Sequence, residues 1–396
     1  MTVLDVDAVR ARFSSLSEGF AFFDAPGGTQ VPDMVAAAVA RNYREASGNL
    51  GAPYETSRRI EALVDEARER SATFLGATPE EITFGANMTS LNFTLSRTVG
   101  RTLSPKDEIV VTALDHDANV APWLELAHDK DLVVRQVGIA EDTTLDYAEL
   151  EGLLSSRTRV VAFPLASNAL GTVVDAARVC SLAHEAGAIA WVDAVQYAPH
   201  FPIDVKAVDA DVLICSAYKF CGPHLGIAYG RRELVESWRP YKARPSANEP
   251  VGHRFETGTL PYELLAALVA TFDYLDAIGG TEEIVAWERR LGERFLAGMP
   301  EGTRLYGSPS MEGRVPTFLV NYEGIPSAEL SAALAKEGFG VWSGDNYYAL
   351  ALYERLQWRD ALRVGIAHYN TLEEVDRLNE TLALLVRRFE ESTDAG

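Results

Sequence analysis

Cysteine and lysine are both scarce in this chain. Among its 396 residues there are three cysteines and six lysines. The odd number of cysteines, at positions 180, 215 and 221, and their spacing predict neither a disulfide framework nor a zinc site. The chain also has no Gly-x-Gly-x-x-Gly or Walker sequence, which argues against an enzyme that uses a nicotinamide or nucleotide cofactor.

Positive charge is in short supply as well. The 36 lysines and arginines are outnumbered by 57 aspartates and glutamates, which gives a formal net charge of -21. Such a field repels phosphate backbones and anionic lipid, so we expect no nucleic-acid partner and no membrane partner. No apolar run approaches the roughly eighteen residues of a membrane-spanning helix. The first residues, MTVLDVDAVRARF, lack the apolar core of a signal peptide, so we expect a cytoplasmic protein.

Apolar material is plentiful by contrast. Hydrophobic residues make up 47% of the chain, enough for a large core in one or two domains. Between residues 80 and 230, short apolar runs alternate with segments of helical periodicity such as 176–186. This alternation is typical of a mainly parallel sheet with helices on both faces, and it predicts an α/β fold. The predicted strands are 81–84, 108–112, 132–134, 159–163, 189–192 and 212–214.

The pattern changes after Glu263. In the region after Glu263 the predicted helices are 264–277, 282–299 and 372–391, and the predicted strands are 317–320 and 362–366. We therefore predict a large domain over residues 20–260 and a smaller α/β domain made of residues 1–19 and 261–396.

Polar residues follow several of the predicted strands. In open parallel sheets, ligands bind beyond the carboxyl ends of the strands. We expect the polar residues at these positions to face one crevice, although each alone is also a common helix-capping or turn residue. They are Asp115, His116, Ser167, Asn168, Asp193, Gln196, Ser216 and Lys219.

Lys219 lies in the stretch SAYKFCGPH, directly after the apolar run 212–215. The other five lysines fit solvated positions. Partial desolvation would lower the pKa of Lys219 and favour the neutral, nucleophilic amine. Such an amine, a carboxylate that keeps a pyridine nitrogen protonated and a ring that lies on the pyridine face are the parts of a pyridoxal 5'-phosphate site.

A phosphate would need a site of its own. The segment FGANMT, residues 84–89, leads from a predicted strand into a helical segment over 90–95, so free main-chain amides and the helix dipole would point at an anion. Capping of the helix by Asn87 or Thr89 explains the same residues equally well. The turn is therefore a candidate phosphate site only in combination with the lysine and the carboxylate.

Together these motifs resemble those of the class V aminotransferase family of fold-type I pyridoxal phosphate enzymes, and within it the cysteine desulfurase-like proteins. The resemblance runs from FDAPGG at 23–28 to YNTLEEV at 369–375. It implies a large domain with a mainly parallel seven-stranded sheet flanked by helices, and a smaller α/β C-terminal domain. Its other motifs come in the family's order: DHDAN at 115–119, SNALGT at 167–172, DAVQ at 193–196, SAYK at 216–219 and RFETGT at 254–259.

The resemblance implies five residues around the cofactor ring. Lys219 matches the Schiff-base lysine, which also moves the α-proton. Asp193 matches the partner of the pyridine nitrogen, and His116 matches the residue stacked on the ring. Gln196 and Asn168 match residues that hydrogen-bond the phenolic oxygen.

For the phosphate, the resemblance implies Ser216 and the main-chain amides of Asn87 and Met88. The family usually has a histidine where Tyr218 stands, and a tyrosine hydroxyl could still reach a phosphate oxygen without bringing a positive charge. Thr259 matches a residue that reaches the phosphate of the neighbouring subunit. The resemblance therefore implies a homodimer with composite active sites.

Arg363 matches the arginine that binds the substrate carboxylate, a task that suits its planar fork. One family feature is missing. Cysteine desulfurases carry a catalytic cysteine on a loop shortly before this arginine, where the thiolate takes the substrate sulfur as a persulfide. Here the loop is SGDNYYA, residues 343–349, and no cysteine follows Cys221, which fits better, like Cys215, as a packing residue. A persulfide-forming desulfurase is therefore disfavoured.

The retained residues predict chemistry at the Cα of an amino acid. Our first expectation is a β-lyase that splits the carbon–sulfur bond of a cysteine-type substrate, with Lys219 as base and Tyr347 or Tyr348 as an acid for the leaving group. Both tyrosines also fit a packing role in their loop. An aminotransferase and an amino-acid epimerase remain alternatives. Outside this class, the alternatives are an oxidoreductase without pyridoxal phosphate and a non-catalytic binding protein.

Overall fold

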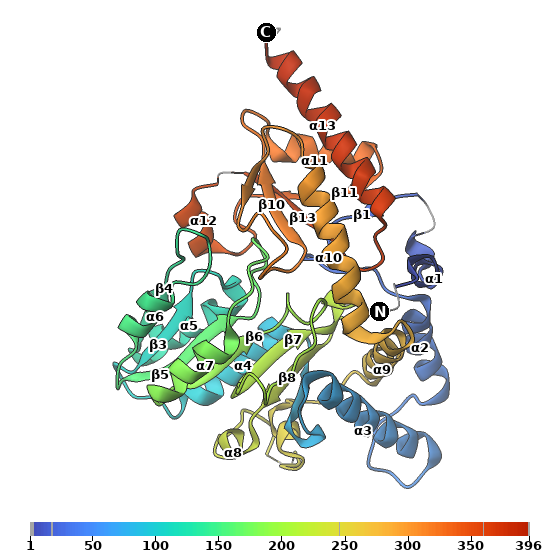
Figure 1. Cartoon of the computed structure of the whole chain (residues 1–396). Helices are drawn as coiled ribbons and strands as arrows, with labels where there is room; N and C mark the ends of the chain where they lie inside the picture. Colours follow the sequence, from blue (N-terminus) through green and yellow to red (C-terminus); the bar gives the residue numbers. More distant parts are fainter. Residues whose placement is uncertain (1–3, 17–18, 245, 359, 395–396) are drawn as a thin grey trace.

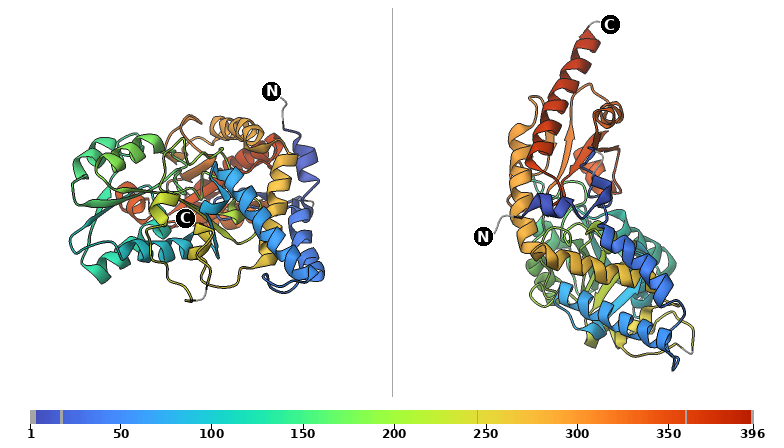
Figure 2. Two further views of the ribbon diagram at one scale, coloured as in Figure 1. Left: turned by 90° about the horizontal axis from the view of Figure 1, so that it is seen from below. Right: turned by 90° about the vertical axis from the view of Figure 1, so that its right-hand side faces the viewer.

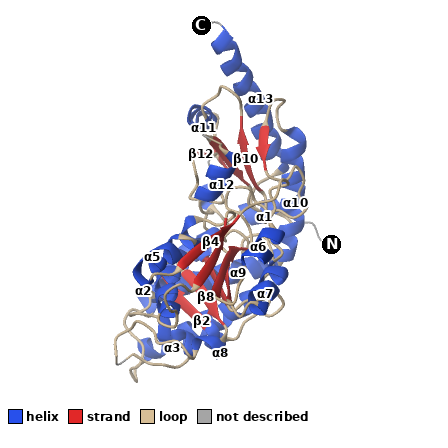
Figure 3. Cartoon of the chain, turned by 90° about the vertical axis from the view of Figure 1, so that its left-hand side faces the viewer, coloured by secondary structure: helices blue, strands red, loops and turns tan. Residues whose placement is uncertain are grey.

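The computed structural model of the chain describes residues 4–16, 19–244, 246–358 and 360–394. Its elements form two α/β parts, a larger one around a seven-stranded sheet and a smaller one around a four-stranded sheet (Figure 1). The two sheets lie one beyond the other, and both have helices beside them (Figure 3). Helix α13 (Leu372–Asp394) projects at the far end of the smaller part and makes the molecule elongated (Figure 2).

The large sheet has the strand order β2-β8-β7-β6-β5-β3-β4. The strands from β7 to β4 are parallel, whereas β8 pairs antiparallel with both β7 and β2. The prediction of a mainly parallel seven-stranded sheet is confirmed. The strands are β2 (Ile82–Gly85), β3 (Glu108–Thr112), β4 (Val133–Val137), β5 (Thr158–Pro164), β6 (Ile189–Asp193), β7 (Val212–Ser216) and β8 (Gly226–Gly230).

Strand β8 is the one strand of this sheet that the sequence pattern does not predict. Its segment, GIAYG, begins and ends with glycine, which weakens the apolar signal. Gly226 has a packing reason, because a Cβ atom there would lie 2.6 Å from the carbonyl carbon of Asn87. The glycine therefore lets β8 approach the turn at Asn87, which leads into helix α4 (Met88–Gly100).

Both faces of the large sheet are buried, which explains why its strands read as continuous apolar runs. Ile214 of β7 packs in the cluster that includes α4 (Met88–Gly100). Its neighbour Leu213 points to the other face and packs with α3 (Glu55–Leu75) and α7 (Ala176–Glu185). The other helices of this part are α2 (Asp33–Glu45), α5 (Ala121–Lys130), α6 (Tyr147–Leu153) and α8 (Arg232–Val235).

The smaller part has an antiparallel sheet with the order β12-β13-β10-β9. The strands and helices predicted for this region are confirmed as β10, β13, α9, α10 and α13 within a few residues at each end. The elements are α9 (Tyr262–Ala277), α10 (Gly280–Gly298), β9 (Arg304–Tyr306), β10 (Thr317–Asn321), α11 (Ser327–Lys336), β12 (Trp342–Gly344), α12 (Leu350–Leu356) and β13 (Ala361–Gly365).

The predicted domain boundary at residue 260 stays a prediction. Strand β1 (Ala21–Phe22) pairs with β11 (Phe339–Gly340), which ties the N-terminal segment to the smaller part. Helix α9, however, contacts α2 and α3 of the larger part. Among the described residues no single helix is long and apolar enough to cross a membrane, although α9 and α10, bent by 67° at their junction, meet that test as a pair by length and composition.

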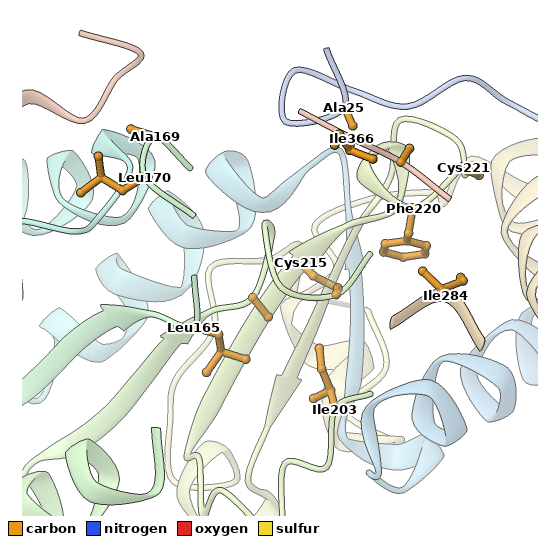
Figure 4. Close-up of a cluster of buried hydrophobic side chains, with 14 of the residues drawn as sticks. Ala25, Leu165, Ala169, Leu170, Ile203, Cys215, Phe220, Cys221, Ile284 and Ile366 are labelled. Atoms are coloured by element: carbon orange, nitrogen blue, oxygen red, sulfur yellow. The ribbon is translucent and has the colours of Figure 1, made fainter. Parts of the chain in front are cut away.

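The hydrophobic core is continuous between the two parts. In Figure 4, Ala25 and Ile366 lie close together, and the ring of Phe220 lies near Ile284. All four are buried in one cluster, together with Cys221. Ala25 comes from the N-terminal segment, Phe220 and Cys221 follow the predicted lysine, and the others come from the last third of the chain. This packing fixes the lysine-bearing turn against both parts.

A buried ion pair fixes the edge strand that leads to the predicted phosphate site. Arg68 Nη2 donates to the Glu256 carboxylate at 2.8 and 2.7 Å, and the main-chain N–H of Phe84 donates to the same group at 2.9 Å. The side chains of Arg68 and Glu256 are 5% and 0% exposed. His253 Nδ1 also lies 2.6 Å from the Glu256 carboxylate, and Arg68 Nη1 donates to the main-chain oxygen of Ile82, but Glu256 is the carboxylate that pairs with the buried Arg68.

We expect Glu256→Ala to lower the free energy of unfolding by about 3–5 kcal/mol, because it leaves the buried Arg68 guanidinium without its carboxylate partner. Urea unfolding followed by fluorescence measures this change. Glu55 is the matched control, since it pairs with Arg58 and Arg59 but is 61% exposed. Glu55→Ala should cost far less than Glu256→Ala, because water screens an exposed ion pair. Equal losses in the two variants would contradict the assignment.

Candidate active site

A cavity of about 310 Å³ lies where the carboxyl ends of the parallel strands meet the smaller part. Strands β5, β6 and β7 contribute residues at or just beyond their ends, and the segment after β11 covers them. Of the eleven predicted site residues, nine line this cavity: Met88, His116, Asn168, Asp193, Gln196, Ser216, Tyr218, Lys219 and Arg363. The expected convergence is therefore observed for these nine.

Lys219 ends the short 3-10 turn Ala217–Lys219 that follows β7, and it is 8% exposed. Its Nζ donates to the main-chain oxygen of Pro26, and it forms no ion pair among the described residues. Burial lowers the pKa of Lys219 to about 7, and the nearby charge of Arg363 acts in the same direction. Asp193 and Asp24 oppose the shift. Burial therefore favours the neutral form of the amine.

Asp193 ends β6 and is 5% exposed. Its Oδ1 accepts a hydrogen bond from the main-chain N–H of Val195 at 2.8 Å. Burial raises the pKa of Asp193 to about 6, while this hydrogen bond and the charge of Lys219 act in the opposite direction. A cationic N–H donor bound beside Asp193 would favour its ionised form.

His116 lies at the start of the turn that follows β3. Its Nδ1 accepts from the N–H of Ala118 at 3.0 Å, which leaves the proton of the neutral imidazole on Nε2. Burial lowers the pKa of His116 to about 4, with smaller contributions from Lys219 and Arg363. The ring stacks on Tyr348, with centroids 5.2 Å apart and planes at 24°. His116 is therefore a neutral, flat group at the cavity wall.

Two amide side chains and one guanidinium lie beside these groups. Gln196 Nε2 donates to the oxygen of Pro26 at 3.0 Å, and Asn168 Nδ2 donates to the oxygen of Tyr347 at 2.8 Å. Arg363 Nη1 donates to the main-chain oxygen of Asn168 at 3.2 Å. Asn168 Oδ1 and Arg363 Nε are buried and have no hydrogen-bond partner in the described part of the chain. Both residues line the cavity, and their unpartnered atoms are buried behind its wall.

The predicted phosphate turn is present at the N-terminus of α4. Ser216 Oγ, at the end of β7, accepts from the N–H of Met88 at 2.9 Å. Asn87 instead caps the helix, because its side chain accepts from the N–H of Ser90 at 2.9 Å, and it does not line the cavity. Thr89, which the sequence suggests only as a helix cap, does line the cavity. The turn thus offers the hydroxyl of Ser216 and the start of a thirteen-residue helix.

Thr259 lies outside the cavity, whereas Tyr218 lies beside Lys219 within it. Thr259 is exposed and lies outside the cavity, so its predicted reach to a second subunit stays a prediction. The Tyr218 ring lies 4.8 Å from Lys219 Nζ and stacks on His224, with centroids 4.8 Å apart. It therefore covers the lysine as a ring, and contact with a phosphate stays a prediction.

Two residues expected in the crevice are elsewhere. Asp115 accepts from the main-chain N–H and the hydroxyl of Thr112, at 2.9 and 2.7 Å, and from Asn119. Ser167 Oγ accepts from the amides of its own turn. Both expectations are wrong, because short-range turn bonding turns these side chains away from the cavity.

Three cavity residues, and Asp24 outside the cavity lining, carry no sequence signal of their own. Asp24 is half-buried, and burial raises its pKa to about 6, with the main chain, Arg363 and Lys219 acting against the shift. Pro26, Gly27 and Trp342 line the cavity. Asp24, Pro26 and Gly27 belong to the motif FDAPGG, and the family resemblance of this motif was the one sequence feature that could have pointed to them. No sequence feature pointed to Trp342.

The loop before Arg363 lies over the cavity, as the resemblance predicts. The described cavity wall includes 343–348 of this loop but no cysteine. Tyr347 is 7% exposed, and its hydroxyl donates to the main-chain oxygens of Trp342 and Ala361 at 3.1 and 2.7 Å. Tyr348 is 66% exposed at the cavity mouth. Of the two roles considered for Tyr347, these bonds favour packing.

Comparison with solved structures defines the fold class first. The apo structure of a cysteine desulfurase from Thermococcus onnurineus NA1 superposes with a TM-score of 0.91 at 26% identity, covering 98% of this chain and 99% of that one. The fold is that of the fold-type I pyridoxal phosphate enzymes. The expected architecture is confirmed.

Comparison of sequences then defines the family. The model for aminotransferase class-V matches residues 21–378, so the chain belongs to the class-V aminotransferase family. It is 33% identical to the probable cysteine desulfurase 2 of Mycobacterium leprae, over 96% of both chains. It is 32% identical to a cysteine desulfurase of Synechococcus elongatus over 98% of this chain, which spans 64% of that protein's length. The chain is a pyridoxal phosphate-dependent enzyme, and the two alternatives outside this class are overturned.

The residues of the cavity fit pyridoxal 5'-phosphate. An aldehyde needs a neutral amine, which burial provides at Lys219. A pyridine nitrogen needs a carboxylate, which Asp193 provides, and a phosphate needs amides and hydroxyls at a helix start, which α4 and Ser216 provide. Asn168 and Arg363, which each have a buried polar atom without a partner in the described part of the chain, also line the cavity.

The pKa of Lys219 leads to a test on the cofactor-free protein. Below pH 7 the amine is protonated in both the folded and the unfolded chain. Between about pH 7 and 10.5 the unfolded chain holds a proton that the folded chain has lost, so the free energy of unfolding should rise with pH. The slope from this group is at most about 1.4 kcal/mol per pH unit. Urea unfolding at a series of pH values measures it.

In this test Lys219→Met should lack the rise that the wild-type protein shows above pH 7. Lys106→Met is the control, since Lys106 is 64% exposed and pairs with Asp131 at the surface. Its pH profile should keep the wild-type slope. Parallel pH profiles for the wild-type protein and Lys219→Met would show that folding does not lower the pKa of the Lys219 amine.

Proposed function

We propose that the protein is a carbon–sulfur β-lyase that acts on a cysteine-type amino acid. The observation that carries the proposal is a cavity that keeps Lys219 and Arg363 while the loop over it, SGDNYYA, contains no thiol. The three cysteines of the chain are all buried outside the cavity. Burial raises the pKa of the Cys180 and Cys221 thiols to about 12, and it raises the pKa of Cys215 as well. A nucleophilic thiolate that could hold sulfur is therefore not supported.

The proposed reaction breaks the Cα–H and Cβ–S bonds of the substrate. With one water molecule, a cysteine conjugate yields a free thiol, pyruvate and ammonium. When bound, pyridoxal phosphate supplies the electron withdrawal that makes the Cα proton acidic. A thiol has an ordinary pKa of about 8.5, so its thiolate leaves readily and needs little help from an acid. The proposal therefore does not depend on Tyr347 or Tyr348 as an acid.

Lys219 supports this reaction as both anchor and base. Its amine would hold the cofactor's aldehyde carbon and, once released by the substrate amine, would take the proton from Cα. A pKa of about 7 suits a base that works near neutral pH. The oxygen of Pro26, which accepts the Nζ hydrogen bond, keeps the side chain in the cavity in the meantime.

Arg363 would bind the substrate carboxylate. Its guanidinium carbon lies 4.4 Å from the ring centroid of Tyr347 and 5.6 Å from that of Trp342. These rings and the bond to Asn168 leave Arg363 few orientations, and the buried Nε has no partner of its own. Burial lowers the pKa of Arg363 to about 10, so the guanidinium stays charged at neutral pH.

The other residues would hold the cofactor. Asp193 would pair with the pyridine nitrogen, neutral His116 would lie on the ring face, and Gln196 and Asn168 would lie beside the phenolic oxygen. Ser216, Tyr218 and the amides of Asn87 and Met88 would contact the phosphate. We further propose a homodimer in which Thr259 of each chain completes the other's site, supported by its exposure. A cytoplasmic location and the absence of nucleic-acid and membrane partners stay predictions.

We expect the purified protein loaded with pyridoxal phosphate to release thiol, pyruvate and ammonium in equal amounts from a cysteine conjugate. Thiol and pyruvate assays measure the products, and a panel of keto acids and D-amino acids covers the two alternatives. Lys219→Ala should lose the visible absorbance of the bound cofactor together with the activity. A keto acid that retains the substrate's carbon chain would identify an aminotransferase, and inverted stereochemistry would identify an epimerase.

We expect Arg363→Lys to reduce kcat/KM by about tenfold to a hundredfold, mainly through KM, because an ammonium cannot replace two parallel N–H donors. Arg304→Lys is the matched control, since Arg304 also lies over a ring, that of Tyr306 at 4.8 Å, on the outer strand β9 of the same sheet. It should leave the kinetics unchanged. Equal kinetics for Arg363→Lys and wild type would exclude Arg363 as the carboxylate site.

A further inference from the structure

We propose that Trp342 and Tyr348 form an aromatic clamp at the mouth of the active-site cavity, and that the clamp selects amino acids whose sulfur carries a flat apolar substituent such as an aryl group. The inference rests on the proposed lyase function and names its substrate class. Both rings line the cavity, and they are 51% and 66% exposed. No other exposed large hydrophobic side chain of the described residues lines it.

The exposure of Trp342 is unusual within this chain. Five of the six tryptophans are at most 6% exposed, and Trp342 is the exception. Burying a tryptophan stabilises a fold, so a tryptophan left at a cavity mouth indicates a ligand that covers it. Its ring also lies against the main chain of Gly27, where a Cβ atom would come within 3.4 Å of two ring atoms.

Trp342 is placed to meet a substrate held by Arg363. The two residues are directly opposite each other in the antiparallel pair β12–β13, so their side chains share one face of the sheet. The guanidinium carbon lies 5.6 Å from the Trp342 ring centroid. The substituent on the sulfur of a substrate bound through its carboxylate therefore lies within reach of this ring.

Tyr348 is held in place although its ring is exposed. Its main-chain oxygen accepts from the N–H of Asp117 at 2.6 Å, and its N–H donates to Asn346 at 2.8 Å. Tyr347 and Tyr348 have φ values of +49° and +57°, which side chains larger than glycine rarely adopt. Such strain persists where contacts enforce it, and it is common at ligand sites. The stack on His116 then fixes the ring above the cavity.

The chemistry of the mouth favours flat apolar groups over charged ones. Two aromatic faces bind a third ring by stacking or edge contact, which is worth about threefold to tenfold in affinity for each ring. The exposed carboxylate of Asp345 also lines the mouth and would repel an anionic substituent. An S-aryl cysteine fits these requirements better than an S-alkyl or S-carboxyalkyl cysteine.

Binding tests the clamp independently of turnover. L-Homophenylalanine and L-norvaline are the carbon analogues of S-phenyl- and S-methyl-L-cysteine, and neither has a bond that a lyase can cleave. Titration of the pyridoxal phosphate-loaded protein, followed by its visible absorbance, should show tighter binding of homophenylalanine. Trp342→Ala and Tyr348→Ala should each weaken the binding of homophenylalanine by about threefold to tenfold and leave the binding of norvaline unchanged.

Conservative and remote variants complete the test. Trp342→Phe and Tyr348→Phe should keep most of the preference, because they keep a ring. Leu350→Ala should keep all of it, because Leu350 is 46% exposed on the same segment but does not line the cavity. Equal loss for both ligands would overturn the clamp. So would a change in the molar mass of Trp342→Ala measured by light scattering, since the ring would then lie in a contact between two chains.

Turnover separates the clamp from the proposed function. With S-phenyl- and S-methyl-L-cysteine as substrates, the ratio of their kcat/KM values should favour the aryl conjugate and fall in the two alanine variants. Pyruvate formed from both conjugates at equal efficiency would overturn the clamp and support the lyase. Tight homophenylalanine binding without pyruvate from any conjugate would support the clamp as an amino-acid selector and overturn the lyase.

Discussion

The burial of one amine opposite one carboxylate is the constraint on which the rest of the site depends. Lys219 and Asp193 are 8% and 5% exposed, and they lie at the ends of the neighbouring parallel strands β7 and β6. Burial moves both groups toward their neutral forms, and their mutual attraction moves both back. The resulting pKa values of about 7 and 6 leave each group able to change protonation near neutral pH. This is the condition for an amine that must act as nucleophile and base in turn.

That constraint requires the two parts of the molecule to pack closely. The partner of the Lys219 amine is the main-chain oxygen of Pro26, which also accepts from Gln196. Pro26 in turn lies against β13, where a Cβ atom on Gly365 would come within 1.9 Å of the proline Cδ. Arg363 is two residues earlier on the same strand. The close packing of Pro26 on Gly365 therefore helps to set the distance between the amine and the guanidinium, between which the proposed substrate would bind.

The sequence predicts the parts of this arrangement that depend on one strand and its end. Lys219 and Asp193 follow short apolar runs typical of buried strands, and the structure places both in the cavity. Asp115 and Ser167 follow the same kind of run, but bonds within their own turns take up their side chains. Sequence spacing does not distinguish these outcomes, because a free polar side chain and a turn residue look alike. Residue chemistry suggested the amine, the carboxylate and the ring of a pyridoxal phosphate site, whereas the position-by-position roles expected of the cavity residues came from the resemblance.

Features that depend on pairing between distant segments could not be predicted. Strand β8 begins and ends with glycine, and its place between β7 and β2 depends on the close approach to Asn87 that Gly226 permits. Trp342 reaches the cavity because β12 pairs with β13 in the register that places it opposite Arg363. A shift of one residue would turn it to the other face. Such registers are fixed by tertiary packing.

The loop over the cavity shows how one position can change the chemistry of a retained site. A thiolate there would take the substrate sulfur and keep it on the protein, and the enzyme would then need a second step to release it. In this chain the same segment places the ring of Tyr348 above the cavity, and the hydroxyl of the neighbouring Tyr347 anchors the segment to the main chain of β13. Neither group can hold sulfur. Under the proposed lyase function, the sulfur leaves on its own substituent, so recognition of that substituent would fall to the residues at the mouth.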